Sequence, residues 1–278
     1  MRKETDIKII CLDLDGTLLD SHKQLSDRNA AALKRAAAAG VEIVPTTGRF
    51  FTGMPQFIQD LPYLHYAITV NGAQVYDIAK DSGIARNEMP LRTALRIMEY
   101  LDDQPVAYDC YQNNWGYMSR RFWENINDFT PDPHYREMVH RLRTPVDDLK
   151  AYLRERGEDV QKVQAFVPDL SAKERIMADL AAAFPETAVT SSVANNIEIN
   201  DAACHKGAAL SQLAEYLGVP IEQTMAFGDG SNDTTMIREA GIGVCMENGC
   251  EASKEAANLI APDCDADGVA VILEKMGF

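Results

Sequence analysis

Nearly continuous apolar runs alternate with longer helical segments at both ends of this chain, and that alternation restricts its fold more than any other feature. The runs have the length and composition of strands buried on both faces: 7–12, 41–45, 66–70, 224–227 and 241–246. The segments between them carry helix signals, such as Ser26 before the alanine-rich stretch that ends at Gly40, and Gly218 after 206–217. This order predicts an α/β fold with a Rossmann-like core built on a parallel sheet.

The middle of the chain, from about residue 84 to residue 200, has a different pattern. It contains a hairpin-like stretch at 106–118 with its turn expected at 113–116, and a helix at 171–184 for which Ser171 is the expected cap. Further short elements are predicted at 152–157, 160–167, 187–192 and 196–200. An α+β region inside an α/β pattern predicts two domains: a split core of 1–83 and 201–278, and an inserted cap of 84–200.

Charge and composition exclude several classes of partner. The formal net charge of −15 repels phosphate backbones, so we expect no nucleic-acid partner. No apolar run approaches the roughly 20 residues of a membrane-spanning helix. The charged segment Met1–Lys8 also lacks the apolar stretch of a signal peptide, so we expect no membrane partner and a cytoplasmic location. The six cysteines are scattered without CxxC spacing, which favours reduced thiols over a disulfide scaffold or a zinc site.

Two acidic loops directly follow predicted strands. Asp13 and Asp15 lie in the first, Asp-Leu-Asp-Gly-Thr-Leu, and Asp229 and Asp233 lie in the second, Gly-Asp-Gly-Ser-Asn-Asp. Open α/β sheets bind ligands at the carboxyl ends of their strands, where these carboxylates can together supply oxygen ligands to a hard cation such as Mg²⁺. A carboxylate there can also act as a nucleophile, and a second one as a general acid and base. Taken alone, the first loop fits a simple turn equally well, and the second fits a glycine-rich turn better than a ligand site.

A hydroxyl and an ammonium group at two further loop ends complete the candidate site. Thr47 follows the predicted strand 41–45, and Lys206 opens the predicted helix 206–217. Both can hold phosphate oxygens and stabilise negative charge in a transition state. Such cations are needed in a chain this acidic if its substrate is an anion. Taken singly, Thr47 is equally consistent with a helix cap and Lys206 with a solvated surface residue.

The four segments together resemble the four motifs of the haloacid dehalogenase superfamily: Asp13-x-Asp15-Gly16-Thr17-Leu18, Thr47-Gly48-Arg49, Lys206-Gly207 and Gly228-Asp229-x-x-Asn232-Asp233. The Cof-type branch of sugar-phosphate phosphatases is the most similar, because the Asn-Gly-Ala sequence at 71–73 and the length of the cap also fit its type IIB cap. The resemblance implies a Mg²⁺-dependent phosphatase that hydrolyses small phosphorylated metabolites, sugar phosphates in particular, through an aspartyl-phosphate intermediate.

The resemblance also implies a role for each motif residue. Asp13 is expected to be the nucleophile, with an ionised side chain because Lys206 lies nearby. Asp15 is expected to be the general acid and then the base. The expected metal ligands are Asp13, Asp15 through its backbone carbonyl, and Asp229, with Asp233 as an outer-sphere ligand or orienting group. The expected phosphate-binding residues are Thr47, Gly48, Lys206 and Asn232. Arg49 is expected to contact the substrate.

Two other functions stay open at the level of the sequence. A phosphomutase of the phosphomannomutase type carries a similar cap, and the motifs do not separate it from a phosphatase. A non-catalytic phosphate-binding member is disfavoured because the motif carboxylates and Lys206 are all present. Dehalogenation is disfavoured by Asp15. We expect a monomer or homodimer that binds a small phosphorylated metabolite, and we expect most cap aromatics, such as Tyr108 and Tyr111, to fill the cap core rather than a pocket.

Overall fold

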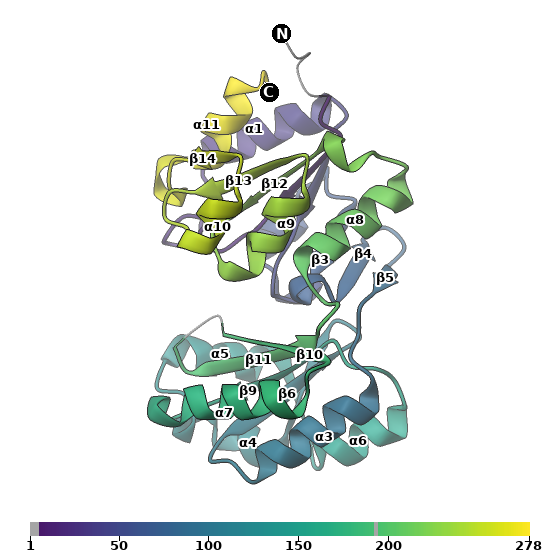
Figure 1. Cartoon of the computed structure of the whole chain (residues 1–278), viewed down its shortest axis with the longest axis vertical. Coiled ribbons are helices and arrows are strands. Elements are labelled where there is room, and N and C mark those ends of the chain that lie inside the picture. The colour runs from purple at the N-terminus through teal and green to yellow at the C-terminus, as the bar shows by residue number, and fades with distance from the viewer. Residues whose placement is uncertain (1–5, 192–193) are drawn as a thin grey trace. The chain divides into compact units, whose positions relative to one another are not determined.

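A computed structural model describes residues 6–191 and 194–278 of the protein, which form two compact units (Figure 1). The chain passes from the core unit to the inserted unit after Arg86 and returns to the core unit after Cys204. The first five residues of the segment Met1–Lys8, and Ser192 at the end of the predicted strand 187–192, lie outside the described residues. Among the described helices, none has the length and apolar character that crossing a bilayer requires.

The core unit is built on a five-stranded sheet with the order β14-β13-β12-β1-β2, in which every neighbouring pair is parallel. Its strands are β1 (Ile9–Leu12), β2 (Glu42–Pro45), β12 (Thr224–Gly228), β13 (Ile242–Met246) and β14 (Leu259–Ala261). Successive side chains of β1 enter different apolar layers, since Ile10 and Leu12 pack with α1 and α11 whereas Ile9 and Cys11 pack with α8. A strand buried on both faces explains why its sequence is apolar throughout.

Helices cover both faces of this sheet. They are α1 (Asp27–Ala38), α2 (Gln56–Gln59), α8 (Lys206–Leu217), α9 (Thr234–Glu239), α10 (Glu251–Ala256) and α11 (Gly268–Lys275). The predicted helix signals are confirmed at α1 and α8. The Ser26 hydroxyl accepts a hydrogen bond from the Asn29 N–H at the start of α1, and Gly218 ends α8 in the left-handed region with φ 67°.

The expectation that residues 66–70 extend the parallel sheet is wrong. β3 (Tyr66–Thr69) instead begins a three-stranded antiparallel sheet with β4 (Gln74–Asp77) and β5 (Ser82–Arg86), and it meets the end of β2 through an isolated bridge between Thr46 and Ile68. The reason is the short connection after β3. A tight turn at 70–72 reverses the chain at once, whereas a parallel neighbour needs a crossover of about a dozen residues or more.

The inserted unit has a six-stranded, mostly antiparallel sheet with the order β10-β11-β9-β6-β7-β8. Its strands are β6 (Ala107–Gln112), β7 (Trp115–Ser119), β8 (Arg143–Val146), β9 (Lys162–Phe166), β10 (Thr187–Thr190) and β11 (Asn196–Asp201). Its helices are α3 (Leu91–Asp102), α4 (Arg120–Glu124), α5 (Pro133–Leu142), α6 (Leu149–Arg156) and α7 (Leu170–Ala183). The predicted fold class, a parallel-sheet α/β core with an inserted α+β cap, is confirmed. The predicted boundaries at 83/84 and 200/201 stay a prediction.

Local details of the inserted unit correct two expectations. The hairpin turn consists of Asn113 and Asn114, with φ of 51° and 58°, because the chain is already extended from Trp115 onwards. The cap of α7 is Asp169 rather than Ser171, since the Asp169 carboxylate accepts a hydrogen bond of 2.9 Å from the Ser171 N–H. Tyr108 and Tyr111 are buried in the unit, as expected for core aromatics.

Candidate active site

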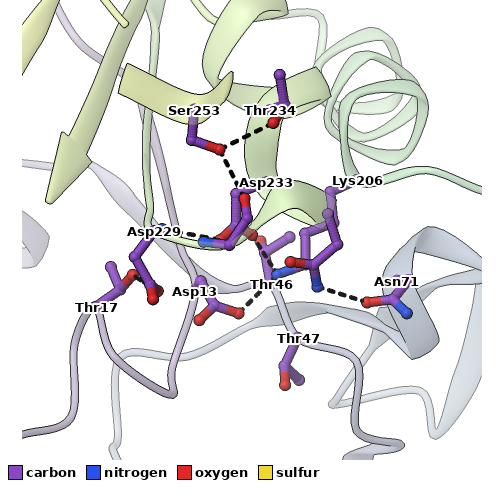
Figure 2. Close-up of polar contacts among 12 residues, drawn as sticks. Asp13, Thr17, Thr46, Thr47, Asn71, Lys206, Asp229, Asp233, Thr234 and Ser253 are labelled. Atoms are coloured by element: carbon purple, nitrogen blue, oxygen red, sulfur yellow. Dashed lines mark hydrogen bonds and ion pairs between the residues drawn. The ribbon is translucent and has the colours of Figure 1, made fainter. Parts of the chain in front are cut away.

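Three adjacent strands of the core sheet end at one edge, and the predicted site residues follow them. Asp13 comes directly after β1, Thr47 comes shortly after β2, and Asp229 comes directly after β12. Lys206, the first residue of α8, reaches the same place (Figure 2). The structure therefore gathers all four motifs at the carboxyl edge of a parallel sheet, where such sheets bind ligands.

Lys206 is completely buried and pairs with two carboxylates. Its Nζ lies 2.6 Å from Asp13 Oδ1 and 2.5 Å from Asp233 Oδ1. Burial by itself lowers the pKa of Lys206, but the two carboxylates outweigh it and raise the pKa above its usual range. Lys206 is therefore a fixed internal cation, and the alternative of a solvated surface lysine is excluded.

The two carboxylates that pair with Lys206 form an acidic cluster with Asp229, in which one oxygen each of Asp13, Asp229 and Asp233 lies within 4.8 Å of the others. Burial raises the pKa of Asp13 to about 8, although Lys206 acts in the opposite direction. Burial also raises the pKa of Asp229 to about 6, despite a hydrogen bond from the Thr17 hydroxyl. Lys206 thus lowers the pKa of Asp13, as predicted, but burial acts more strongly in the other direction, and the ionised state of Asp13 stays a prediction. An oxygen-only donor set with surplus negative charge fits a hard divalent cation such as Mg²⁺.

The loop that carries Asp229 is held from two sides. Asp233 Oδ2 accepts hydrogen bonds from the backbone N–H groups of Asp229 and Gly230, at 2.9 and 2.8 Å. On the other side, the buried Ser253 hydroxyl donates to the Gly230 carbonyl at 2.7 Å and lies 2.9 Å from the Thr234 hydroxyl (Figure 2). These bonds suit an orienting function for Asp233. Ser253 and Thr234 were missed by sequence reasoning, because a hydroxyl in a short helix carries no pattern of its own.

Gly16 brings the first acidic loop against the second. Its φ is +91°, a conformation that residues with a side chain rarely adopt. A Cβ at this position would lie 2.6 Å from Asp229 Oδ2. Glycine is therefore required here both for the backbone turn and for the close approach of Asp229.

Asp15 does not belong to the acidic cluster, because its carboxylate is paired with Arg49. Arg49 donates from Nε to Oδ2 and from Nη2 to Oδ1, and Lys23 Nζ lies 3.1 Å from Oδ1. Burial alone raises the pKa of Asp15, but the charges of Arg49 and Lys23 outweigh it and hold the pKa below its usual value. Asp15 is thus a carboxylate in this arrangement. Lys23 was not singled out from the sequence, where it reads as an ordinary loop lysine.

Thr47 and Asn232, two predicted phosphate-binding residues, are connected through Asn71. The Thr47 carbonyl accepts a hydrogen bond of 3.0 Å from the Asn71 N–H, and Asn232 Nδ2 donates to Asn71 Oδ1 at 3.0 Å. Thr47 itself is buried, and its hydroxyl accepts from the Arg49 N–H at 3.2 Å. A Cβ on Gly48 would lie 3.0 Å from Asn71 Oδ1, so this glycine packs directly on the Asn71 side chain.

This chain is similar to known proteins along nearly its whole length. A family model for haloacid dehalogenase-like hydrolases matches residues 10–273. The 5-amino-6-(5-phospho-D-ribitylamino)uracil phosphatase YcsE of Bacillus subtilis (strain 168) is 29% identical over 274 residues, covering 97% of this chain and 95% of its own. Pyridoxal phosphate phosphatase YbhA of Escherichia coli (strain K12) is 29% identical, covering 95% and 96%. A solved haloacid dehalogenase-like hydrolase from Bacteroides thetaiotaomicron superimposes with a TM-score of 0.82 at 26% identity, covering 97% and 99%.

Proposed function

The chain belongs to the haloacid dehalogenase-like hydrolases and is a phosphatase, and from this premise we propose a Mg²⁺-dependent enzyme that hydrolyses small phosphorylated metabolites, sugar phosphates in particular. The observation that carries the proposal is the buried pair of Lys206 and Asp13 beside two further carboxylates, Asp229 and Asp233. Phosphoryl transfer depends mainly on positioning and on neutralising negative charge, and this arrangement supports both.

The proposed metal site uses oxygen ligands only. Asp13, Asp229 and the backbone carbonyl of Asp15 would hold Mg²⁺, and Asp233 would orient the Asp229 loop through its hydrogen bonds to that backbone. When bound, Mg²⁺ supplies positive charge that offsets the charge of the carboxylates and of the phosphate. The surplus of carboxylates over the single Lys206 ammonium supports a cation at this point.

Asp13 is the proposed nucleophile. Lys206 engages Oδ1, so Oδ2 is the oxygen outside that ion pair. In the first step Oδ2 forms a bond to phosphorus while the bond from phosphorus to the leaving oxygen breaks, which gives an aspartyl phosphate. Lys206, the Thr47 hydroxyl, the loop at Gly48 and the Asn232 amide are proposed to bind the phosphoryl oxygens, because each lies at the same sheet edge and offers a positive charge or a hydrogen-bond donor.

Asp15 is the proposed acid and base. It would give a proton to the leaving oxygen in the first step. In the second it would take a proton from water, whose oxygen attacks phosphorus and releases the Asp13 carboxylate. Arg49 and Lys23 hold Asp15 as a carboxylate here, so the first role requires Asp15 to leave these partners and take up a proton from solvent before the leaving oxygen receives it. The phosphate of a bound substrate is an anion that competes for Arg49, which agrees with the proposed substrate contact of this residue.

The substrate class rests on the relatives. One is named for a compound with a phosphorylated ribityl chain and the other for pyridoxal phosphate, both small phosphate monoesters. We therefore propose a small phosphorylated metabolite as substrate and include both compounds, with a set of sugar phosphates, in the test.

The test measures phosphate release from this panel with and without Mg²⁺. Asp13→Asn keeps the shape of the side chain and removes the nucleophile, and Asp60→Asn makes the same change on an exposed aspartate of the core unit. We expect Mg²⁺-dependent release in the wild type and in Asp60→Asn, and none in Asp13→Asn. Release that survives in Asp13→Asn would refute the proposed nucleophile. An isomeric sugar phosphate formed without free phosphate would instead indicate a mutase.

A further inference from the structure

The turn after β3 has an unusual backbone. Val70, Asn71 and Gly72 are consecutive and all have positive φ, at 50°, 60° and 101°. This region is disfavoured for residues with a side chain and most of all for a β-branched residue such as valine, whereas asparagine and glycine tolerate it. A conformation of this kind persists only where the surrounding structure enforces it, and such places concentrate at functional sites.

Two hydrogen bonds attach this turn to the proposed phosphate-binding loop. The Val70 N–H donates to the Arg49 carbonyl and the Asn71 N–H donates to the Thr47 carbonyl, both at 3.0 Å. The Val70 side chain is completely buried, so its packing also holds the turn in place. The positive φ values thus direct two successive N–H groups at the loop that carries the Thr47 hydroxyl.

The side chains of the same turn contact the other two phosphate-binding segments. Asn71 is nearly buried, and its Oδ1 accepts the hydrogen bond from Asn232 Nδ2 (Figure 2). Gly72 packs against the residue before Lys206, since a Cβ on Gly72 would lie 2.5 Å from the His205 carbonyl oxygen. One short turn therefore touches the segments that carry Thr47, Asn232 and Lys206.

We propose that Asn71 is a positioning residue of the phosphoryl-transfer site and acts through Asn232. An amide nitrogen has two hydrogens in fixed directions, so accepting one of them at Asn71 Oδ1 sets the direction of the other. An oxygen at this position also keeps the nitrogen of Asn232, rather than its oxygen, on the Asn71 side. The Asn232 amide is thereby held as a donor for a phosphoryl oxygen, while the backbone of the same turn holds the Thr47 loop.

The inference rests on the proposed function and is tested by a double-mutant cycle. Asn71→Gly removes the side chain and keeps the positive φ, and Asn232→Ala removes its partner. Asn71→Asp keeps an oxygen acceptor on a backbone that still tolerates positive φ. Asn114→Gly is the matched control, because Asn114 has a φ of 58° in the hairpin of the inserted unit. The probes are p-nitrophenyl phosphate as substrate and inorganic phosphate as inhibitor, with Mg²⁺ present.

We expect Asn71→Gly to lower kcat/KM about tenfold and to weaken inhibition by inorganic phosphate, with Asn114→Gly unchanged. Asn232→Ala should lower kcat/KM about tenfold when it is introduced into the wild type or into Asn71→Asp. Introduced into Asn71→Gly, it should lower kcat/KM less than about twofold. Each effect of Asn232→Ala is measured against the parent enzyme that already carries the Asn71 substitution. The comparison therefore holds even if Asn71→Asp has a low kcat or Asn71→Gly is less stable.

Two results would overturn the inference. One is an Asn71→Gly enzyme with wild-type kcat/KM and wild-type phosphate inhibition. The other is a cycle in which the effects of Asn71→Gly and Asn232→Ala multiply, since independent effects mean that Asn71 does not act through Asn232. A wild-type enzyme without Mg²⁺-dependent phosphate release would refute the proposed function instead, and it is recognised before any variant is compared.

Discussion

Arg49 holds Asp15 through two parallel hydrogen bonds, from Nε to Oδ2 and from Nη2 to Oδ1, each 2.9 Å long. A guanidinium group matches a carboxylate in this two-point geometry, which fixes the direction of the carboxylate as a single ammonium group does not. The third nitrogen, Nη1, donates to the Gly53 carbonyl at 3.3 Å. The guanidinium is therefore engaged by the protein itself, and this affects how Arg49 contributes to the reaction.

We predict that Arg49→Ala lowers kcat/KM about tenfold or more, because the substrate loses its proposed contact and the proposed acid and base loses a partner that orients it. Arg49→Lys should recover only part of kcat/KM, since lysine lacks the two-point geometry. Steady-state kinetics measures both, with Arg28→Ala as a control that removes an exposed arginine paired with Glu274. A raised KM with unchanged kcat would show that substrate contact is the main role of Arg49.

Lys206→Met should strongly destabilise the protein. It leaves Asp13 and Asp233 buried without their shared cation, and breaking a buried pair in this way costs about 3–5 kcal/mol of unfolding free energy. Added Mg²⁺ should recover part of the loss, because it replaces the missing positive charge. Urea unfolding with and without Mg²⁺ checks this, with the exposed Lys34→Met as the control. An unfolding free energy equal to that of the wild type would contradict the structural role.

The stabilising effect of Mg²⁺ should depend on pH. The pKa values of Asp13 and Asp229 are raised from 3.8 to about 8 and about 6. A carboxyl group that binds its proton more tightly in the folded state stabilises the fold at low pH, and this stability is lost as pH rises from about 4 towards the folded pKa. Cation binding requires the ionised forms and so releases protons on binding at low pH.

We therefore predict that the rise in Tm caused by Mg²⁺ grows between pH 5 and pH 8. Thermal melts with MgCl₂, compared with NaCl at equal ionic strength, measure the difference at each pH. A rise in Tm that is constant or larger at pH 5 would mean that Asp13 and Asp229 do not titrate with metal binding.

Gly16→Ala should weaken the site by moving Asp229. The added Cβ meets the Asp229 carboxylate and also forces alanine into a φ of +91°, so we expect a stability loss of about 1–3 kcal/mol. The concentration of Mg²⁺ for half-maximal activity should rise about tenfold, corresponding to roughly 1.4 kcal/mol of binding energy. Gly218→Ala is the control, because it has positive φ with open space around the added Cβ. Equal Mg²⁺ requirements in the two variants would argue against a displaced Asp229.

Local signals made much of the fold predictable from the sequence. The helix Lys206–Leu217 was predicted with its observed ends because its apolar spacing and the following glycine act within the helix itself. The buried strands around Asp13 and Asp229 were predictable because a strand covered on both faces must be apolar throughout. The candidate site followed from the same source, since residues at the carboxyl ends of such strands meet at one edge.

Tertiary structure alone decided the contacts between distant segments. The pairing of Arg49 with Asp15, the hydrogen bond between Asn232 and Asn71, and the antiparallel partner of β3 leave no periodic trace in the sequence. Each depends on where two separate loops come to lie once the core has packed. The raised pKa of Asp13 could not be predicted from the sequence for the same reason. The free energy of removing a carboxylate from water depends on all the segments that pack around it.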